Sequence, residues 1–275
     1  MNDVIGVAGC GTMGLSMAHQ LAAGGFEVWG HDVRPAAEFG DFAPRMIADR
    51  RDFADRCDIV VSMVLTVDQT KELFFADGGL FTAANPPDVW VVCSTMSPRD
   101  LPPLAARLPE GVGIVDAPVS GSHLGAETGT LTFMVGGSDA DVAAVRPALE
   151  AMGSSIHHAG PLGAGMTCKV VNNVVILATI VAVRKGLALA KARGVPEQAV
   201  LDVLTAGSGY VWYAEKINEV DWGREGYAAH VPGNTMAILE KDLKAFIDAF
   251  EELPDLITDK FEESLMENLL AFKPF

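Results

Sequence analysis

The chain has 275 residues, of which 49% are hydrophobic and 20% are charged, and its formal net charge is −16. This length suits two domains, and the composition indicates a packed globular protein. The negative charge repels phosphate backbones and acidic lipid surfaces, so the sequence argues against nucleic-acid and membrane partners.

The four cysteines are scattered along the chain and form no Cys-x-x-Cys pair. Such spacing is typical of reduced thiols rather than of a disulfide framework or a zinc site. The first residues show no basic start followed by an apolar block, so no signal peptide is predicted. The expected compartment is the cytoplasm.

A glycine-rich turn at residues 9–14 joins a predicted strand, residues 4–8, to an amphipathic helix that ends at Gly24-Gly25. Its first glycine suits a tight turn, its second leaves room for a pyrophosphate, and its third lets helix and strand pack closely. The amino terminus of the helix would then face the phosphates. A glycine-rich turn without a ligand is the alternative. The predicted cofactor-binding residues are Gly9, Cys10, Gly11, Thr12, Met13 and Gly14.

Asp32 follows a second predicted strand, residues 26–31, and lies 18 positions after Gly14. A carboxylate at this place hydrogen-bonds the adenosine ribose and repels a 2′-phosphate, which favours NAD over NADP. Arg34 lies two residues further on, where an arginine can hold that phosphate, so NADP stays open.

Two more strands are predicted at residues 58–64 and 88–93, and helical patterns alternate with them. This alternation is typical of a doubly wound parallel sheet, in which ligands lie beyond the carboxyl ends of the strands. The residues that follow these two strand ends are candidates to line the dinucleotide, although each could be an ordinary loop residue. They are Leu65, Thr66, Ser94 and Thr95.

A long loop with three glycines is predicted between strands at residues 113–119 and 131–135. Its free backbone N–H groups and hydroxyls suit a small carboxylate, and a plain hairpin is the alternative. His123 lies in this loop, where a lone histidine is more often solvated or structural than a substrate contact. A helix over residues 138–152 and a strand near 156–157 follow.

Helices dominate beyond residues 160–163, so a domain boundary is predicted there. The patterns predict one helix of about thirty residues, and then helices over 196–204, 236–250 and 255–270. The long helix is not expected to cross a membrane, because Asn172, Asn173, Arg184 and Lys185 interrupt its apolar run.

Lys169 and Asn173 lie four residues apart on this helix, and therefore one turn apart on the same face. Lysines near a helix start often extend their amines into solvent, which is the alternative to a functional role. The flanking residues are nearly all apolar or small, so we expect the face that carries Lys169 to lie against other groups.

Four stretches, in this order, make the chain resemble the β-hydroxyacid dehydrogenase family, which includes 3-hydroxyisobutyrate dehydrogenases and tartronate semialdehyde reductases. They are G-x-G-x-x-G at 9–14, DAPVSG at 116–121, G-x-G-x-x-x-K-x-x-x-N at 163–173 and KDL at 241–243. The resemblance covers nearly the whole chain. It implies a Rossmann-type doubly wound NAD(P)-binding domain over residues 1–162. An all-α substrate and oligomerisation domain over residues 163–275 follows, entered by the long interdomain helix.

The resemblance also implies hydride transfer between the nicotinamide and a small 3-hydroxy acid or semialdehyde. Lys169 is then the general acid/base with Asn173 as its helper, and Lys241 reaches both cofactor and substrate. The substrate carboxylate would be held by Ser120, Gly121 and Ser122, and Leu65, Thr66 and Thr95 would line the dinucleotide. Ser122 stands where the family usually has a second glycine, and this leaves the identity of the acid open.

Two rival functions remain. One is a reductase of another carbonyl or of an imine on the same scaffold, and Lys169 argues against the imine. The other is a dinucleotide-sensing regulator, which would need the glycine-rich turn but has no use for Lys169 and Asn173. A phosphogluconate-type activity is disfavoured, because the chain has no Arg or Lys cluster suited to a phosphate. We expect a homodimer or homotetramer.

Overall fold

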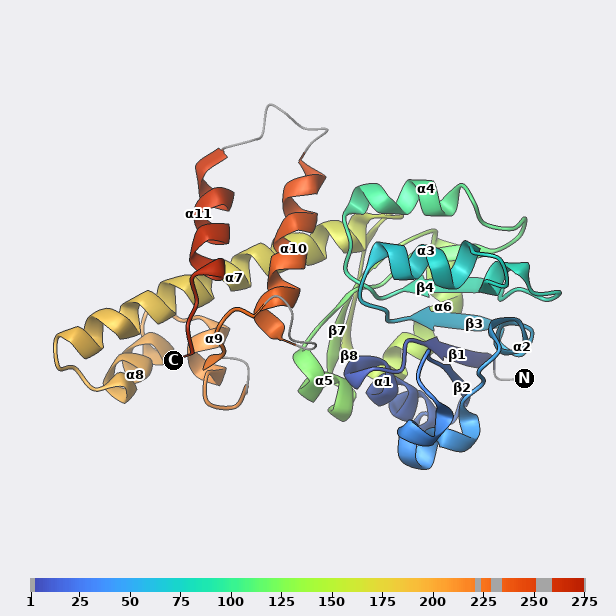
Figure 1. Ribbon diagram of the computed structural model, residues 1–275, viewed down its shortest axis with the longest axis horizontal. Helices are drawn as coiled ribbons and strands as arrows, with labels where there is room; N and C mark the ends of the chain where they lie inside the picture. The colour runs from blue at the N-terminus through green and yellow to red at the C-terminus, as the bar shows by residue number, and fades with distance from the viewer. Residues whose placement is uncertain (1–2, 221–223, 229–233, 251–258, 275) are drawn as a thin grey trace. The chain divides into compact units, whose positions relative to one another are not determined.

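The computed structural model describes residues 3–220, 224–228, 234–250 and 259–274 (Figure 1). The chain divides into two compact units, Met1–Lys169 and Val170–Phe275. The predicted boundary between residues 162 and 163 lies just before helix α7 (Ala164–Ala192), whereas the division falls inside that helix. The difference has a packing reason, because Met166 in the first turn of α7 is buried in a core cluster of the first unit.

An eight-stranded sheet forms the centre of the first unit, in the order β2-β1-β3-β4-β5-β7-β6, with β8 beside β7. Strands β1 to β5 are parallel, and β7 runs antiparallel to both β5 and β6. Strand β1 lies between β2 and β3, so the chain first adds a strand on one side of β1 and then crosses to the other side. This order confirms the doubly wound sheet. The strands are β1 (Val4–Ala8), β2 (Glu27–His31), β3 (Ile59–Ser62), β4 (Val89–Val92), β5 (Gly113–Asp116), β6 (Val119–Ser120), β7 (Leu131–Gly136) and β8 (Gly153–Gly160).

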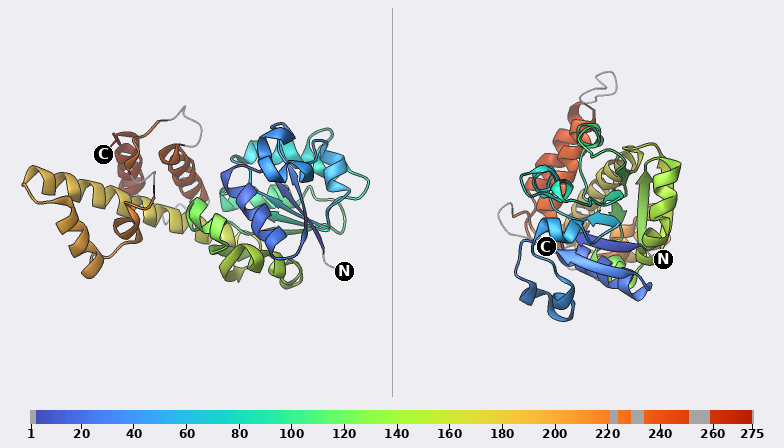
Figure 2. Two further views of the ribbon diagram at one scale, coloured as in Figure 1. Left: turned by 90° about the horizontal axis from the view of Figure 1, so that it is seen from below. Right: turned by 90° about the vertical axis from the view of Figure 1, so that its right-hand side faces the viewer.

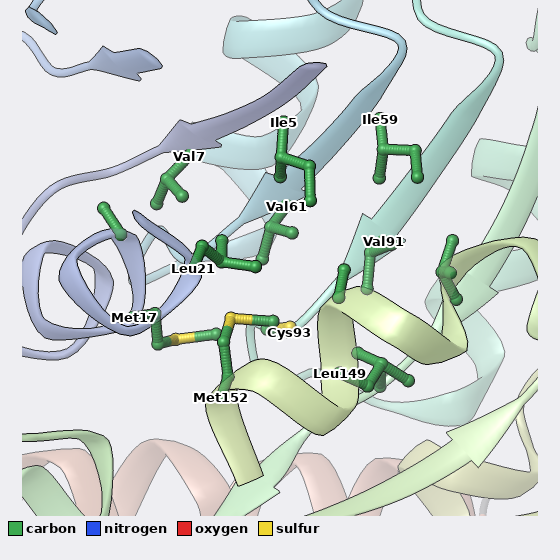
Figure 3. Packing of buried hydrophobic residues seen from close by; sticks show 14 of the residues in the cluster. Ile5, Val7, Met17, Leu21, Ile59, Val61, Val91, Cys93, Leu149 and Met152 are labelled. Atoms are coloured by element: carbon green, nitrogen blue, oxygen red, sulfur yellow. The ribbon is translucent and has the colours of Figure 1, made fainter. Parts of the chain in front are cut away.

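Helices cover both faces of this sheet (Figures 1 and 2). Side chains alternate between the two faces along each strand. On one face Val61 packs with Leu21 of α1 and Leu149 of α6 (Figure 3). On the other face Trp90 stacks on Phe74 of α3, with 4.0 Å between ring centroids. The helices are α1 (Thr12–Ala23), α2 (Arg50–Ala54), α3 (Val67–Phe75), α4 (Leu101–Ala105), α5 (Ser122–Thr128) and α6 (Asp139–Met152), with 3₁₀ helices η1 (Ala36–Arg45), η2 (Leu80–Thr82) and η3 (Pro98–Asp100).

Helix α5 corrects the prediction of a long irregular loop between residues 119 and 131. Gly125 and Ala126 are buried in this short helix, which packs on α1. Gly129 ends it in the left-handed conformation that glycine adopts at helix ends. Because the Gly125 amide already donates to the Gly121 carbonyl, fewer free N–H groups face a ligand than the loop prediction assumed.

The described residues of the second unit form helices and the loops that join them, and they confirm the predicted long helix and the helices predicted at 196–204 and 236–250. The last predicted helix, 255–270, is present from residue 259, and residues 255–258 lie outside the described part. Helices α10 and α11 contact each other, as do α8 and α9 (Figure 1). The helices are α7, α8 (Glu197–Ala206), α9 (Trp212–Lys216), α10 (Thr235–Ala249) and α11 (Asp259–Leu270).

Helix α7 is long and apolar enough to cross a membrane by length and composition alone, and its most apolar 18-residue window has a mean hydropathy of 1.9. Within the fold, 44% of that window is buried. Val170, Val174, Leu177 and Val181 recur every three to four residues and pack into the core of the second unit. One face of the helix therefore belongs to the core of the second unit.

Candidate active site

The carboxyl ends of four parallel strands lie in one row across the first unit. Ala8 of β1 pairs in register with Ser62 of β3, Ser62 with Val92 of β4, and Val92 with Asp116 of β5. The glycine-rich turn, the segment 63–66 and the segment 93–95 all follow residues of this row. The structure therefore brings the predicted cofactor-binding residues of the first unit to one edge of the sheet, where such sheets bind nucleotides.

Two of the three glycines in the turn are required by contacts within the protein, and the third is not. A Cβ atom on Gly9, which has a φ of +92°, would lie 2.6 Å from the Met63 carbonyl oxygen. A Cβ atom on Gly14 would lie 2.0 Å from the Gly9 carbonyl oxygen. A Cβ atom on Gly11 would meet nothing within 4 Å. The bare backbone at Gly11 thus fits a role toward a ligand, such as the close approach of a pyrophosphate.

Gly11 is also the N-cap of α1, and no side chain caps this helix start. The first turn of α1 contains no acidic residue. A helix start of this kind presents unpaired backbone N–H groups and the positive end of the helix dipole, which together attract an anion. The turn therefore fits the phosphates of a dinucleotide, as predicted.

Asp32 and Arg34 form a close pair just after β2. The Asp32 carboxylate accepts hydrogen bonds from the Arg34 backbone N–H at 3.0 Å and from its Nε at 3.1 Å. Burial opposes ionisation of Asp32, but these hydrogen bonds and the arginine charge outweigh it and lower the pKa of the carboxyl group. The guanidinium also donates to the Cys10 carbonyl at 2.8 Å and stacks over Phe39.

Leu65 and Thr66 follow β3 and occupy the same edge of the sheet. Leu65 is 52% exposed, so its side chain is available to a ligand. Thr66 has a local structural role, because its hydroxyl accepts the Gln69 N–H in a capping box that starts α3.

Ser94 and Thr95 follow β4 at this edge, and Thr95 is half-buried. Ser94 is 2% exposed, and its hydroxyl has no hydrogen-bond partner within the described part of the chain. Buried hydroxyls usually have a hydrogen-bond partner, so the Ser94 hydroxyl fits a contact with a polar group of a ligand.

The predicted carboxylate-binding residues lie where β6 leads into α5. Ser120 ends β6, and Gly121 has a φ of +130°. Ser122 has a φ of +57° and is the only described residue other than glycine in that region. The backbone here keeps the conformation that suits glycine, so the replacement of a glycine by Ser122 changes the side chain rather than the path of the chain.

Lys169 lies in the second turn of α7 and is half-buried, between the exposed Cys168 and the buried Val170. The start of α7 is hydrogen-bonded to the sheet edge described above, because Asp116 accepts the backbone N–H of Met166 at 2.6 Å. The helix that carries Lys169 therefore begins at the same sheet edge as the glycine-rich turn.

In the second unit, Asn173 and Lys241 are held by one carboxylate. Asn173 Nδ2 donates to Asp242 Oδ2 at 2.7 Å, and Lys241 Nζ lies 2.9 Å from Asp242 Oδ1. Asn173 and Asp242 are 6% and 5% exposed. Asp242 was not among the predicted site residues, although the sequence carries a signal. It lies between Leu239 and Leu243 in the apolar stripe of α10, where an unpartnered carboxylate would be costly.

Two family models match most of the chain. Residues 4–160 match the NAD binding domain of 6-phosphogluconate dehydrogenase, and residues 163–256 match the NAD-binding model of NADP-dependent 3-hydroxyisobutyrate dehydrogenase. The chain is 36% identical over 217 residues to an NAD-dependent L-serine dehydrogenase from Pseudomonas aeruginosa. That alignment covers 78% of this chain and 73% of the relative. The chain is 32% identical over 252 residues to a probable 3-hydroxyisobutyrate dehydrogenase from Mycobacterium tuberculosis, which covers 89% and 84%.

A solved structure has the same fold. The crystal structure of a 3-hydroxyisobutyrate dehydrogenase from Salmonella typhimurium superposes with a TM-score of 0.81 and 28% sequence identity. The alignment covers 97% of this chain and 92% of that one, so it includes both units.

Proposed function

Since this chain belongs to the β-hydroxyacid dehydrogenase family of NAD(P)-dependent oxidoreductases, we propose that it oxidises a small 3-hydroxy acid to the semialdehyde, or catalyses the reverse reduction, with NAD as its favoured cofactor. A bound nicotinamide supplies the hydride acceptor or donor for this chemistry. The chain's own residues hold the two reactants and move one proton.

The cofactor preference rests on Asp32. Gly11 and the start of α1 would hold the pyrophosphate, and the ionised Asp32 would accept hydrogen bonds from the ribose. Arg34, the residue that could hold a 2′-phosphate, is engaged by Asp32 and by the Cys10 carbonyl. A 2′-phosphate would have to displace these contacts and stand beside a carboxylate, which favours NAD.

The proton step is assigned to Lys169. In oxidation, the neutral amine accepts the proton of the substrate hydroxyl while hydride leaves the carbon, and in reduction the protonated amine returns it. Ser120, Gly121 and Ser122 would hold the substrate carboxylate, and Asn173 would assist Lys169. The roles of Asn173 and Lys241 stay predictions. The observation that carries the proposal is the start of α7, with Lys169 in its second turn, at the dinucleotide edge of the sheet.

The experiment compares Lys169→Ala with the unmodified enzyme. Initial rates are measured over C3 to C5 hydroxy acids, semialdehydes and cyclic imines, each with NAD and with NADP. General acid–base help is worth roughly 10²–10⁴-fold, so turnover should fall by about that factor while NADH binding is retained. Lys185→Ala, at an exposed lysine on the same helix, is the matched control and should keep full turnover.

The outcomes separate the rival functions. Near-normal turnover in Lys169→Ala would remove Lys169 from the mechanism. Turnover of imines but not of hydroxy acids would favour the imine reductase. NADH binding by the unmodified protein, with no turnover of any substrate, would favour a dinucleotide-sensing regulator.

We also propose that the enzyme works as a homodimer or homotetramer in the cytoplasm, with no nucleic-acid or membrane partner. Val171, Val175 and Leu189 of α7 are 48%, 57% and 62% exposed, and Val203 of α8 is 69% exposed. Apolar side chains exposed along neighbouring segments are typical of surfaces that bind another subunit.

A further inference from the structure

Asp116 is a fully buried carboxylate that the proposed chemistry does not use. It ends β5 and is 0% exposed. Its Oδ1 accepts the Gly163 backbone N–H at 2.8 Å, and its Oδ2 accepts the Met166 backbone N–H at 2.6 Å. Burial raises the pKa of Asp116, and these amides act in the opposite direction.

The two amides lie at the start of α7, where backbone N–H groups have no acceptor within the helix. Capping residues usually come from the chain just before the helix. Here the acceptor comes from a strand of the sheet, 47 and 50 residues away in the sequence. One side chain therefore both satisfies the helix start and attaches it to the sheet.

The contact is closely packed, and two glycines make it possible. A Cβ atom on Gly136 would lie 2.4 Å from Asp116 Oδ1. A Cβ atom on Gly165 would lie 2.8 Å from Asp116 Oδ2 and 2.3 Å from the Met134 carbonyl oxygen. Any side chain at either position would push the helix start away from β5 and β7. Gly165 is thus explained by this packing and not by a ligand.

We propose that Asp116 is a positioning residue, which fixes the first turn of α7 on the sheet and so sets where the Lys169 amine stands relative to Ser120. Lys169 follows Met166 by less than one helical turn. Ser120 follows Asp116 by four residues, at the end of β6. A shift of the helix start would therefore move the proton-transfer group away from the carboxylate-binding turn. This inference rests on the proposed role of Lys169.

The test begins with Asp116→Asn. The amide keeps one acceptor oxygen and turns the other into an NH₂ group that faces a backbone N–H, so one of the two hydrogen bonds is lost. A misplacement of about 1 Å can lower a rate by about 10²-fold, so kcat should fall by about 10- to 100-fold. KM for NAD should stay unchanged, because the glycine-rich turn is not altered. Amide hydrogen exchange over residues 163–169 should accelerate.

Asp49→Ala is the control, because an Asn at this position would keep the oxygen, Oδ1, that accepts both hydrogen bonds. The Asp49 carboxylate also accepts two backbone N–H groups at a helix start, those of Arg51 and Asp52 in α2. Its loss should accelerate exchange at α2 and lower the melting temperature, yet leave kcat unchanged. A general loss of stability would lower kcat in both variants. The proposal requires a lower kcat in Asp116→Asn alone.

Gly165→Ala moves the helix start by a different physical means and covers the case in which Asp116→Asn fails to fold. It should give the same pattern, a lower kcat with unchanged KM for NAD. Unchanged kcat in either folded variant would overturn the positioning role and leave the proposed function standing. An unmodified enzyme that turns over no hydroxy acid would overturn both, and the exchange data would still show whether Asp116 holds the helix start.

Discussion

Removing the Asp242 carboxylate should destabilise the helical unit and expose a strong coupling with Asn173. The Asn173 side chain is 6% exposed and that of Asp242 is 5% exposed. A hydrogen bond of 2.7 Å joins the Asn173 amide to the Asp242 carboxylate. A hydrogen bond to a charged group contributes about 1.5–3 kcal/mol, and a buried donor left without a partner costs about 1–3 kcal/mol. Asp242→Ala should therefore lower the free energy of unfolding by about 2.5–6 kcal/mol, the sum of these two contributions.

Asn173→Ala should have an effect of similar size, because it leaves the Asp242 carboxylate buried without its amide partner. In the double variant neither group remains, so its decrease in the free energy of unfolding should be well below the sum of the two single decreases. We expect a coupling free energy of about 1.5–3 kcal/mol, within the range seen for residues in direct contact.

The assay is urea denaturation followed by circular dichroism for the four members of the double-mutant cycle. Lys244→Ala is the control, because the Lys244 side chain on the same helix is 65% exposed and its ion pair with Glu240 is screened by solvent. Its loss should stay below about 1 kcal/mol. Losses from Asp242→Ala and Asn173→Ala that simply add would refute the reasoning, since they would show that the two side chains stabilise the unit independently.

Two further predictions concern the first unit. Gly11→Ala should raise KM for NAD and lower the melting temperature only slightly, because alanine is a poorer N-cap than glycine but its Cβ atom meets nothing within 4 Å. Gly14→Ala should fail to fold stably, because its Cβ atom would meet the Gly9 carbonyl oxygen. A thermal melt and initial rates check both variants, and an unchanged KM in Gly11→Ala would contradict the cofactor role. Burial raises the pKa of Cys10 and of Cys57 to about 12, and that of Cys93 as well, so a thiol reagent at pH 8 should label Cys168 alone in the native chain and all four cysteines in urea.

The sheet and the long helix could be predicted because local patterns determine them. Short apolar runs between turn residues identified β1, β3 and β4, and the length of the apolar pattern identified α7. Helix α5 was missed for a local reason as well. The glycines at 121, 125 and 129 indicate a loop, yet Gly125 is buried inside a helical turn, where a Cβ atom would lie 3.3 Å from Leu131 Cδ2 at the start of β7.

The residues that hold the candidate site could not be predicted, because their partners are distant in the sequence. Asp242 and Asn173 are 69 residues apart, and Asp116 and Met166 are 50 residues apart. A buried carboxylate in an apolar stretch shows that a partner exists, but only the tertiary fold shows which group it is. The glycine-rich turn differs, because its three glycines and the strand and helix beside it are contiguous.

Asp116 and Asp242 each attach α7 to another element of the same unit. Each is a buried carboxylate carried by another element, and each hydrogen-bonds α7 within its own unit, Asp116 at Met166 and Asp242 at Asn173. Lys169 follows Met166 by three residues, so the Asp116 contact restrains the turn that carries the amine within the first unit. The Asp242 contact restrains the next turn of the helix within the second unit. Asp116→Asn should therefore lower kcat, whereas Asp242→Ala should lower the stability of the helical unit.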